Sequence, residues 1–219
     1  GAVTTAALST PAFPWLSAQV IQVAGHDLWA FRMSYAGELG WELHMPFDAL
    51  CDVYAALWTA GEPHGIADYG SFAMNVLRME KGFKGAGELT NEVTLAEADV
   101  LRFARRDKEY LGRDATLNPE LRWVCAYLEI APDGAIDGHG GEAVLRDGQV
   151  VGSTASVAFG HSVGKILAFA YIAPDAAVAG TALEVVIHGT PRPARVLAEP
   201  AYDPQSLRPR MDGYEEAAQ

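Results

Sequence analysis

In the first half of the chain, apolar and polar residues alternate in three short stretches, residues 19–23, 28–35 and 41–45. This period of two predicts β-strands, because successive side chains of a strand point to opposite faces. After Pro46 the apolar residues recur at the spacing of one helix face, and a second helical pattern runs over residues 71–81. The residues that carry the first helical pattern are Leu50, Val53, Tyr54 and Leu57. The first part of the chain is therefore predicted to be α+β, an antiparallel sheet with helices.

The pattern changes after Asn118-Pro119. Short β-like runs follow one another with Gly and Pro between them, and no helical period interrupts them. Asp147-Gly148 between two such runs is a strong hairpin signal. The runs lie at 123–130, 143–146, 150–159, 165–172, 183–188 and 194–198. We expect a first domain over residues 1–117 and a small C-terminal β-barrel domain over 118–219, with a frayed tail after Arg210.

Composition excludes several classes of protein. The chain has 219 residues and a net charge of −12, which argues against non-specific nucleic-acid binding. No apolar run approaches the roughly 18 residues that a membrane span needs, so no membrane contact is expected. Cys51 and Cys125 are interpreted as small buried residues in a reducing cytoplasm, and the six histidines show no metal-ligand spacing. These features predict a cytoplasmic protein without a metal site.

The stretch that carries candidate chemistry is the strand–turn–strand pattern of residues 28–45. Gly37 and Gly40 are suited to a tight turn with positive φ, and Tyr35 leads into it. In the second strand Glu42 and His44 face away from the side that bears Trp41, Leu43 and Met45. The Glu42 carboxylate is therefore either solvated or directed into a cavity. Glu38, in the turn, is expected to be solvated.

Four blocks of sequence resemble one known family. Residues 34–43 read SYAGELGWEL, residues 77–83 LRMEKGF, residues 110–115 YLGRDA and residues 199–204 EPAYDP. In this order they are similar to motifs of the glycine cleavage T-protein, or aminomethyltransferase, family. Within it, the likeness is strongest to the folate domains of dimethylglycine and sarcosine dehydrogenases and oxidases.

The resemblance implies roles for particular residues. The glutamate that matches Glu42 holds the pterin ring of tetrahydrofolate, whose adjacent N–H and NH₂ donors one carboxylate can accept together. The tyrosine that matches Tyr35 lines the folate cavity. An aromatic residue at the edge of the core is an equally good interpretation of Tyr35. Arg208 is a weaker candidate for contact with the folate tail. Arg78 and Glu80 are interpreted as structural, an ion pair or cap that holds the following loop. The basic residues Arg102, Arg105, Arg106 and Arg113 are expected on a solvated strand face rather than against a polyglutamate tail or an acidic partner.

The resemblance also implies an activity, the transfer of a one-carbon unit from an aminomethyl or iminium donor to tetrahydrofolate, giving 5,10-methylenetetrahydrofolate. Flavin chemistry is expected only if a separate flavin domain exists. The N-terminal third of the family's domain, with its functional carboxylate, is expected to be missing, so no catalytic residue is assigned. Another copy or that missing segment is then expected to cover an exposed apolar face. The alternative is a non-catalytic folate-binding or scaffold module of a larger flavin-dependent protein.

Overall fold

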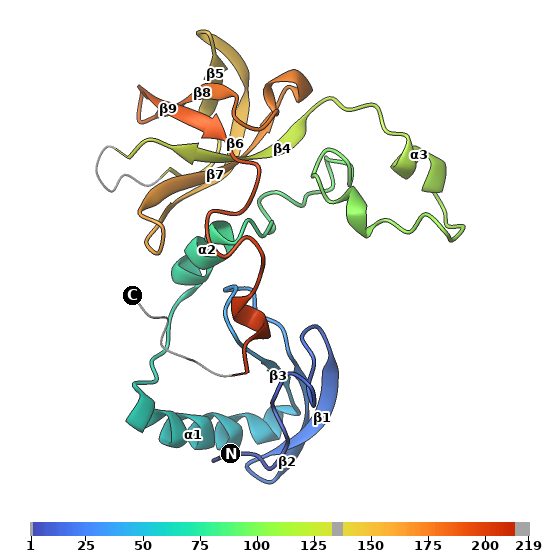
Figure 1. The fold of residues 1–219 in the computed structure, drawn as a ribbon, viewed down its shortest axis with the longest axis vertical. Helices are drawn as coiled ribbons and strands as arrows, with labels where there is room; N and C mark the ends of the chain where they lie inside the picture. Colours follow the sequence, from blue (N-terminus) through green and yellow to red (C-terminus); the bar gives the residue numbers. More distant parts are fainter. Residues whose placement is uncertain (1, 133–137, 213–219) are drawn as a thin grey trace. The chain divides into compact units, whose positions relative to one another are not determined.

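The computed structural model describes residues 2–132 and 138–212. The chain forms two compact units, which are considered separately (Figure 1). The first combines Gly1–Met74 with Gln205–Gln219, and the second is Asn75–Pro204. No helix in the described residues is long and apolar enough to cross a membrane.

The first unit is built on a three-stranded antiparallel sheet in the order β1-β2-β3, namely β1 (Ala18–Val23), β2 (His26–Phe31) and β3 (Glu42–His44). A tight turn at Ala24 and Gly25, both with positive φ, joins β1 to β2. A 3₁₀ turn, η1 (Phe47–Ala49), leads into helix α1 (Leu50–Gly61), and η2 (Glu62–His64) follows it. One face of the sheet packs against Ala49 and Val53. The sheet residues of this core are Ile21, Val23, Leu28 and Ala30.

The second unit is dominated by a closed antiparallel barrel with the strand order β4-β7-β6-β5-β8-β9 (Figure 1). Its strands are β4 (Val124–Ile130), β5 (Ala143–Arg146), β6 (Gln149–Gly160), β7 (Lys165–Ile172), β8 (Ala182–Ile187) and β9 (Thr190–Val196). Asp147 and Gly148 take φ values of 53° and 74°, which suits a two-residue hairpin loop with the twist of its strands. Alternate apolar side chains fill the barrel, among them Leu128, Ile130, Ile166 and Ile187.

The remaining elements are short. Helix α2 (Ser71–Glu80) leads toward the barrel, and η3 (Leu101–Phe103) and α3 (Arg113–Leu117) lie in the long connection before it. The 3₁₀ turn η4 (Pro174–Ala176) follows β7, and η5 (Arg208–Arg210) lies in the C-terminal part of the first unit.

The predicted α+β layer followed by a β-barrel is confirmed, and several details differ. The second strand ends at Phe31 rather than residue 35, because the Met33 N–H bonds the Phe31 carbonyl and reverses the chain. Helix α3 was not predicted, and Cys51 is exposed rather than buried. In the tail, Met211 and Asp212 accept hydrogen bonds from Arg32 and Thr10, so the chain is still held there; residues 213–219 lie outside the described part.

The connection before the barrel is fixed by a buried carboxylate, Glu97. Its side chain has no exposed surface and accepts hydrogen bonds from the Arg122 guanidinium and the Thr94 N–H. These hydrogen bonds, of which the one from Arg122 has the largest effect, lower the pKa of Glu97 from 4.5 to about 2. A carboxyl whose pKa is depressed by folding stabilises the fold above its unfolded pKa, and this contribution is lost as the pH falls toward 2.

We therefore expect Glu97→Gln to lower the free energy of unfolding of the second unit at pH 6 and to have less than half that effect at pH 3. The effect at pH 6 should be about 1–2 kcal/mol, less than the full shift implies, because water screens the exposed Arg122. Urea unfolding at the two pH values measures it, with exposed Glu120→Gln as the control. An effect of equal size at both pH values would show that the charge of Glu97 does not stabilise the fold.

Candidate functional site

The candidate site lies in the first unit, on the face of the sheet opposite α1. The strand register places Phe31 beside Glu42 and Trp29 beside His44. Trp29 is 52% exposed, and its β1 neighbour Val20 is 55% exposed. These side chains point away from the core because Leu28, Ala30 and Leu43, one residue out of phase with them, pack inward. The site is thus an open sheet face that combines aromatic rings with one carboxylate.

Glu42 is a surface carboxylate with aromatic neighbours. Its side chain is 51% exposed, and its Oε2 lies 3.5 Å from His44 Nε2. The rings of Phe31 and His44 have centroids 4.8 Å apart, and those of Trp29 and Phe31 are 6.3 Å apart. A carboxylate at the edge of such a surface can accept two hydrogen bonds from a flat ligand whose ring lies over the neighbouring side chains.

The loop between β2 and β3 contains Tyr35, and Glu38 of the same loop contacts Arg208, the third predicted site residue. Gly37, with φ of 82°, makes the bend that was expected of it, whereas Gly40 does not have positive φ. The Arg208 Nε donates to Glu38 Oε2 at 3.0 Å, and both side chains are about one-quarter exposed. Glu38 is therefore paired rather than solvated, a correction to the sequence interpretation. Tyr35, in the same loop, is 39% exposed.

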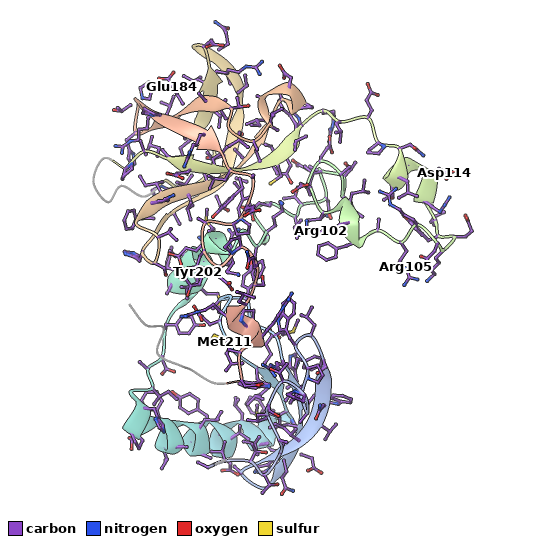
Figure 2. The ribbon with its side chains drawn as sticks, viewed as in Figure 1. Arg102, Arg105, Asp114, Glu184, Tyr202 and Met211 are labelled. Atoms are coloured by element: carbon purple, nitrogen blue, oxygen red, sulfur yellow. The ribbon has the colours of Figure 1, made fainter. Side chains whose placement is uncertain are left out.

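Arg32, a residue that sequence reasoning gave no role, organises this loop. It is fully buried, and its guanidinium donates to the carbonyls of Phe13 and Met211, both at 2.7 Å, and to the Thr10 hydroxyl. The guanidinium also lies 5.7 Å from the centre of the Trp41 ring. Arg32 thus ties the N-terminal segment and residues 205–212 to the end of β2; Met211 is labelled in Figure 2. The sequence does contain an indication of this role, because Arg32 is a charged residue at the end of an apolar strand and just before the SYAGELGWEL block.

The charged residues of the LRMEKGF block have structural roles in the second unit. Arg78 forms an ion pair with buried Glu88 at 2.8 Å and also donates to Ser156. The Glu80 carboxylate accepts the Ser162 N–H, between β6 and β7. The structural interpretation of Arg78 as an ion pair that holds the following loop is confirmed. Lys81 bonds Asp203 of the EPAYDP block, so two of the four sequence blocks meet here.

The basic residues before the barrel lie on η3, on α3 and on the loop between them rather than on the expected strand face. Figure 2 labels Arg102, Arg105 and Asp114 along this segment. Arg105 forms an ion pair with Asp107, and Arg113 is within ion-pair distance of Asp114. Acidic neighbours therefore offset part of the positive charge that was considered for a polyglutamate tail or an acidic partner.

Two hollows in the second unit are alternative places for a ligand. The larger, of about 550 Å³, is lined by residues that include Lys84, Tyr127 and Phe169. The smaller, of about 420 Å³, is lined by residues that include Arg122 and Trp123. Neither hollow includes Tyr35, Glu42 or Arg208. In the described residues, no three His, Cys, Asp or Glu side chains gather in a way that could hold a metal ion.

Comparison with known proteins identifies the family. Residues 1–108 match the model of the GCVT N-terminal domain, and residues 124–203 match that of the glycine cleavage T-protein C-terminal barrel domain. The chain belongs to the glycine cleavage T-protein family. The predicted family is thereby confirmed, and the barrel model spans strands β4 to β9 of this T-protein-family chain.

Relatives of this T-protein-family chain include much longer proteins. It is 34% identical to mouse mitochondrial dimethylglycine dehydrogenase over 96% of its own length and 25% of that protein. It is 36% identical to human mitochondrial sarcosine dehydrogenase over 78% of its length and 19% of that protein. A probable aminomethyltransferase of Thermococcus kodakarensis is 29% identical, with 87% of this chain and 54% of that protein covered. The chain thus spans about a quarter of the dimethylglycine dehydrogenase that it matches.

A solved structure supports the same fold. Aminomethyltransferase T from Bartonella henselae matches with a TM-score of 0.73 and 19% sequence identity. The match covers 81% of this chain and 50% of that chain.

Proposed function

We propose that the open sheet face around Glu42 is the pterin-binding part of a tetrahydrofolate site. The observation that carries the proposal is the Glu42 carboxylate, half exposed at the edge of a surface formed by the Phe31 and His44 rings. The chemistry of these groups fits a pterin. The ring N–H and the exocyclic NH₂ of a pterin are adjacent donors, which one carboxylate accepts as a pair, and the flat ring can lie against aromatic side chains.

Tyr35 and Arg208 are proposed to complete the folate contacts. Tyr35, partly exposed in the loop before Glu42, would line the ligand with its ring. Arg208 would meet a carboxylate of the folate tail, and the neighbouring Glu38 holds its guanidinium in place at 3.0 Å. A tail carboxylate would have to share this cation with Glu38, which makes Arg208 the weaker of the proposed contacts.

The activity that we propose for the protein to which this chain contributes is tetrahydrofolate-dependent one-carbon transfer. The folate nitrogens form bonds to the one-carbon unit while its bond to the donor's nitrogen breaks and the donor's amine leaves, giving 5,10-methylenetetrahydrofolate. The donor would be a small aminomethyl or iminium compound, as the names of the aminomethyltransferase and of the dimethylglycine and sarcosine dehydrogenase relatives suggest. The residues of this chain bind and orient the folate in this scheme, and no residue is assigned to catalysis. Flavin would act only through a separate domain.

A second candidate is a non-catalytic folate-binding or scaffold module of a larger flavin-dependent protein. The chain spans 25% of mouse dimethylglycine dehydrogenase and 19% of human sarcosine dehydrogenase, so turnover by those proteins does not assign turnover to this chain. In either case we propose a cytoplasmic location and a domain division at residues 117/118, near the start of the barrel model at residue 124. Both candidate functions use the same folate site, and they differ in whether the protein catalyses one-carbon transfer.

We expect Glu42→Gln to weaken folate binding about ten- to a hundredfold. The variant replaces one acceptor oxygen with a donor and removes a charged hydrogen-bond pair worth roughly 1.5–3 kcal/mol. Calorimetric titration with 5-formyltetrahydrofolate, a stable folate, measures the change in affinity, preferably in the complete parent protein.

The matched control is Asp27→Asn, because Asp27 is an exposed carboxylate at the far end of β2, on the same outward face of the sheet as Trp29. Glu38→Gln was expected from the sequence to change little, but its ion pair with Arg208 makes it a poorer control. Equal affinity of the wild type and Glu42→Gln would refute the assignment of Glu42 as the pterin anchor.

A further inference from the structure

The larger hollow of the second unit has an apolar wall of small side chains. Its volume, about 550 Å³, is in the range of small-ligand sites. It lies beside the first half of β4: this strand pairs with β9 over residues 128–130, whereas residues 124–127 and the chain after β9 line the hollow. Ala177, Ala179 and Ala198 give the wall its width, and Leu197 and Pro200 add apolar surface. The wall therefore suits the apolar body of a ligand.

The cation of this hollow is Lys84, whose side chain is only 10% exposed. Its ammonium lies 5.5 Å from the centre of the Phe169 ring, which also lines the hollow. Its ion pair with Asp99 has an N–O distance of 3.3 Å, longer than the about 2.7–2.9 Å of a strong charged hydrogen bond. The Asp99 side chain is 66% exposed, so water can take over its part of this pair at little cost. The ammonium has three N–H donors, and an anion in the hollow can accept the one that Asp99 gives up.

The other charged groups of the hollow limit the charge of such an anion. Arg102, labelled in Figure 2, also lines the hollow, and its guanidinium donates to the Asp99 carbonyl at 3.2 Å. Glu199 and Asp99 are both exposed, so water screens these carboxylates more than it screens the buried Lys84. They still repel negative charge, which favours a ligand with one charge over a ligand with two. Burial raises the pKa of the Cys125 thiol to about 12, so this lining residue is neutral at neutral pH.

We propose that this hollow is a second ligand site, which binds a compact monocarboxylate with an apolar body, such as a substituted benzoate. The carboxylate would accept a hydrogen bond from the Lys84 ammonium in place of Asp99. The body would lie against the alanine wall and Leu197 and lose contact with water, which supplies much of the affinity. The proposal does not depend on folate binding, because the hollow contains none of the residues proposed for the folate site.

The test compares three probes by calorimetry on the chain. The first, 4-methylbenzoate, has both the charge and the apolar body. The second, 4-methylbenzamide, has the same shape without the charge, and the third, acetate, has the charge without the body. We expect 4-methylbenzoate to bind at least about tenfold more tightly than either of the others. NMR shifts of the backbone amides locate the bound probe, and we expect the largest changes at Lys84, Tyr127 and Phe169, which line the hollow.

Two variants test the exchange of Asp99 for the ligand. Lys84→Met should weaken the binding of 4-methylbenzoate about tenfold and change that of 4-methylbenzamide little. Asp99→Asn removes the competing charge and should strengthen the binding of 4-methylbenzoate about threefold. Asparagine accepts the positive φ of 54° at this position, so this variant keeps the fold even if Lys84→Met does not. Lys165→Met is the matched control, because Lys165 pairs with Glu129 outside the hollow and its loss should leave the binding unchanged.

Four results would overturn the proposal. The first is no binding of 4-methylbenzoate at about 10 mM, or binding no tighter than that of the amide. The second is a set of NMR shifts that lies outside the hollow. The third is an unchanged affinity for 4-methylbenzoate in Asp99→Asn. The fourth is displacement of 4-methylbenzoate by 5-formyltetrahydrofolate, which would make the hollow part of the folate site. If 4-methylbenzoate binds as expected and the folate does not bind at all, the folate proposal fails and this one stands.

Discussion

Arg78→Met destabilises the second unit by about 3–5 kcal/mol, the largest effect that we expect of any single substitution here. Glu88 has no exposed side-chain surface, and Arg78 provides its ion pair at 2.8 Å. The carboxylate also accepts the Gly85 N–H and the Ser156 hydroxyl, so these bonds would keep it buried in place without its cation. Removing one partner of a buried pair costs more than removing both, because the remaining charge is uncompensated.

Hydrogen exchange of the β6 and β7 amides, which belong to the same unit, measures this loss as a lower free energy of opening. The double variant Arg78→Met/Glu88→Gln removes the buried charge and should recover about 1–2 kcal/mol of the loss. Arg105→Met is the control, because the Arg105 ion pair with Asp107 is exposed. If the double variant is less stable than Arg78→Met, an uncompensated charge on Glu88 is not the cause of the destabilisation.

The second large effect is expected for Arg32→Met, which should destabilise the first unit by about 2–4 kcal/mol. Methionine keeps much of the length of the side chain but donates no hydrogen bond. The Phe13 and Met211 carbonyls would lose a charged donor, and the contact with the Trp41 ring would change. Because Met211 is bound by Arg32, the segment that carries Arg208 should loosen together with the loop before β3.

Hydrogen exchange again provides the measurement, with faster exchange expected for β1, β2 and residues 205–212 and unchanged exchange for the barrel strands. Arg210→Met is the matched control, since the Arg210 guanidinium lies over the Trp15 ring but is exposed. Unchanged exchange of residues 205–212 in Arg32→Met would show that Arg32 does not hold this segment.

The parts of the fold that the sequence predicts well are those in which a local pattern decides the structure. The strand limits at 143–146 and 165–172 agree with β5 and β7, because turn residues end both runs sharply. Asp147-Gly148 predicts its hairpin because its two residues accept the positive φ that such a loop requires. Glu42 and His44 face outward as the alternation predicts. The residues that share the outward face with Glu42 could be found only once the register with β2 was known, because pairing is a property of two distant segments.

The other differences also have non-local causes. The burial of Arg32 depends on contacts with residues 10–13 and 211, far away in sequence. The pairing of Glu38 with Arg208 joins residues 170 positions apart, so no local pattern could show that Glu38 is not solvated. The meeting of the LRMEKGF and EPAYDP blocks through Lys81 and Asp203 is hidden in the sequence for the same reason.

The central claim is that Glu42 anchors a pterin, and the most direct test is a crystal structure of the parent protein with bound 5-formyltetrahydrofolate. We predict that both oxygens of the Glu42 carboxylate accept hydrogen bonds from the pterin N–H and NH₂, with the ring beside Phe31 and Tyr35. A pterin bound instead in the hollow lined by Lys84, Tyr127 and Phe169, with Glu42 in contact only with water, would contradict the account.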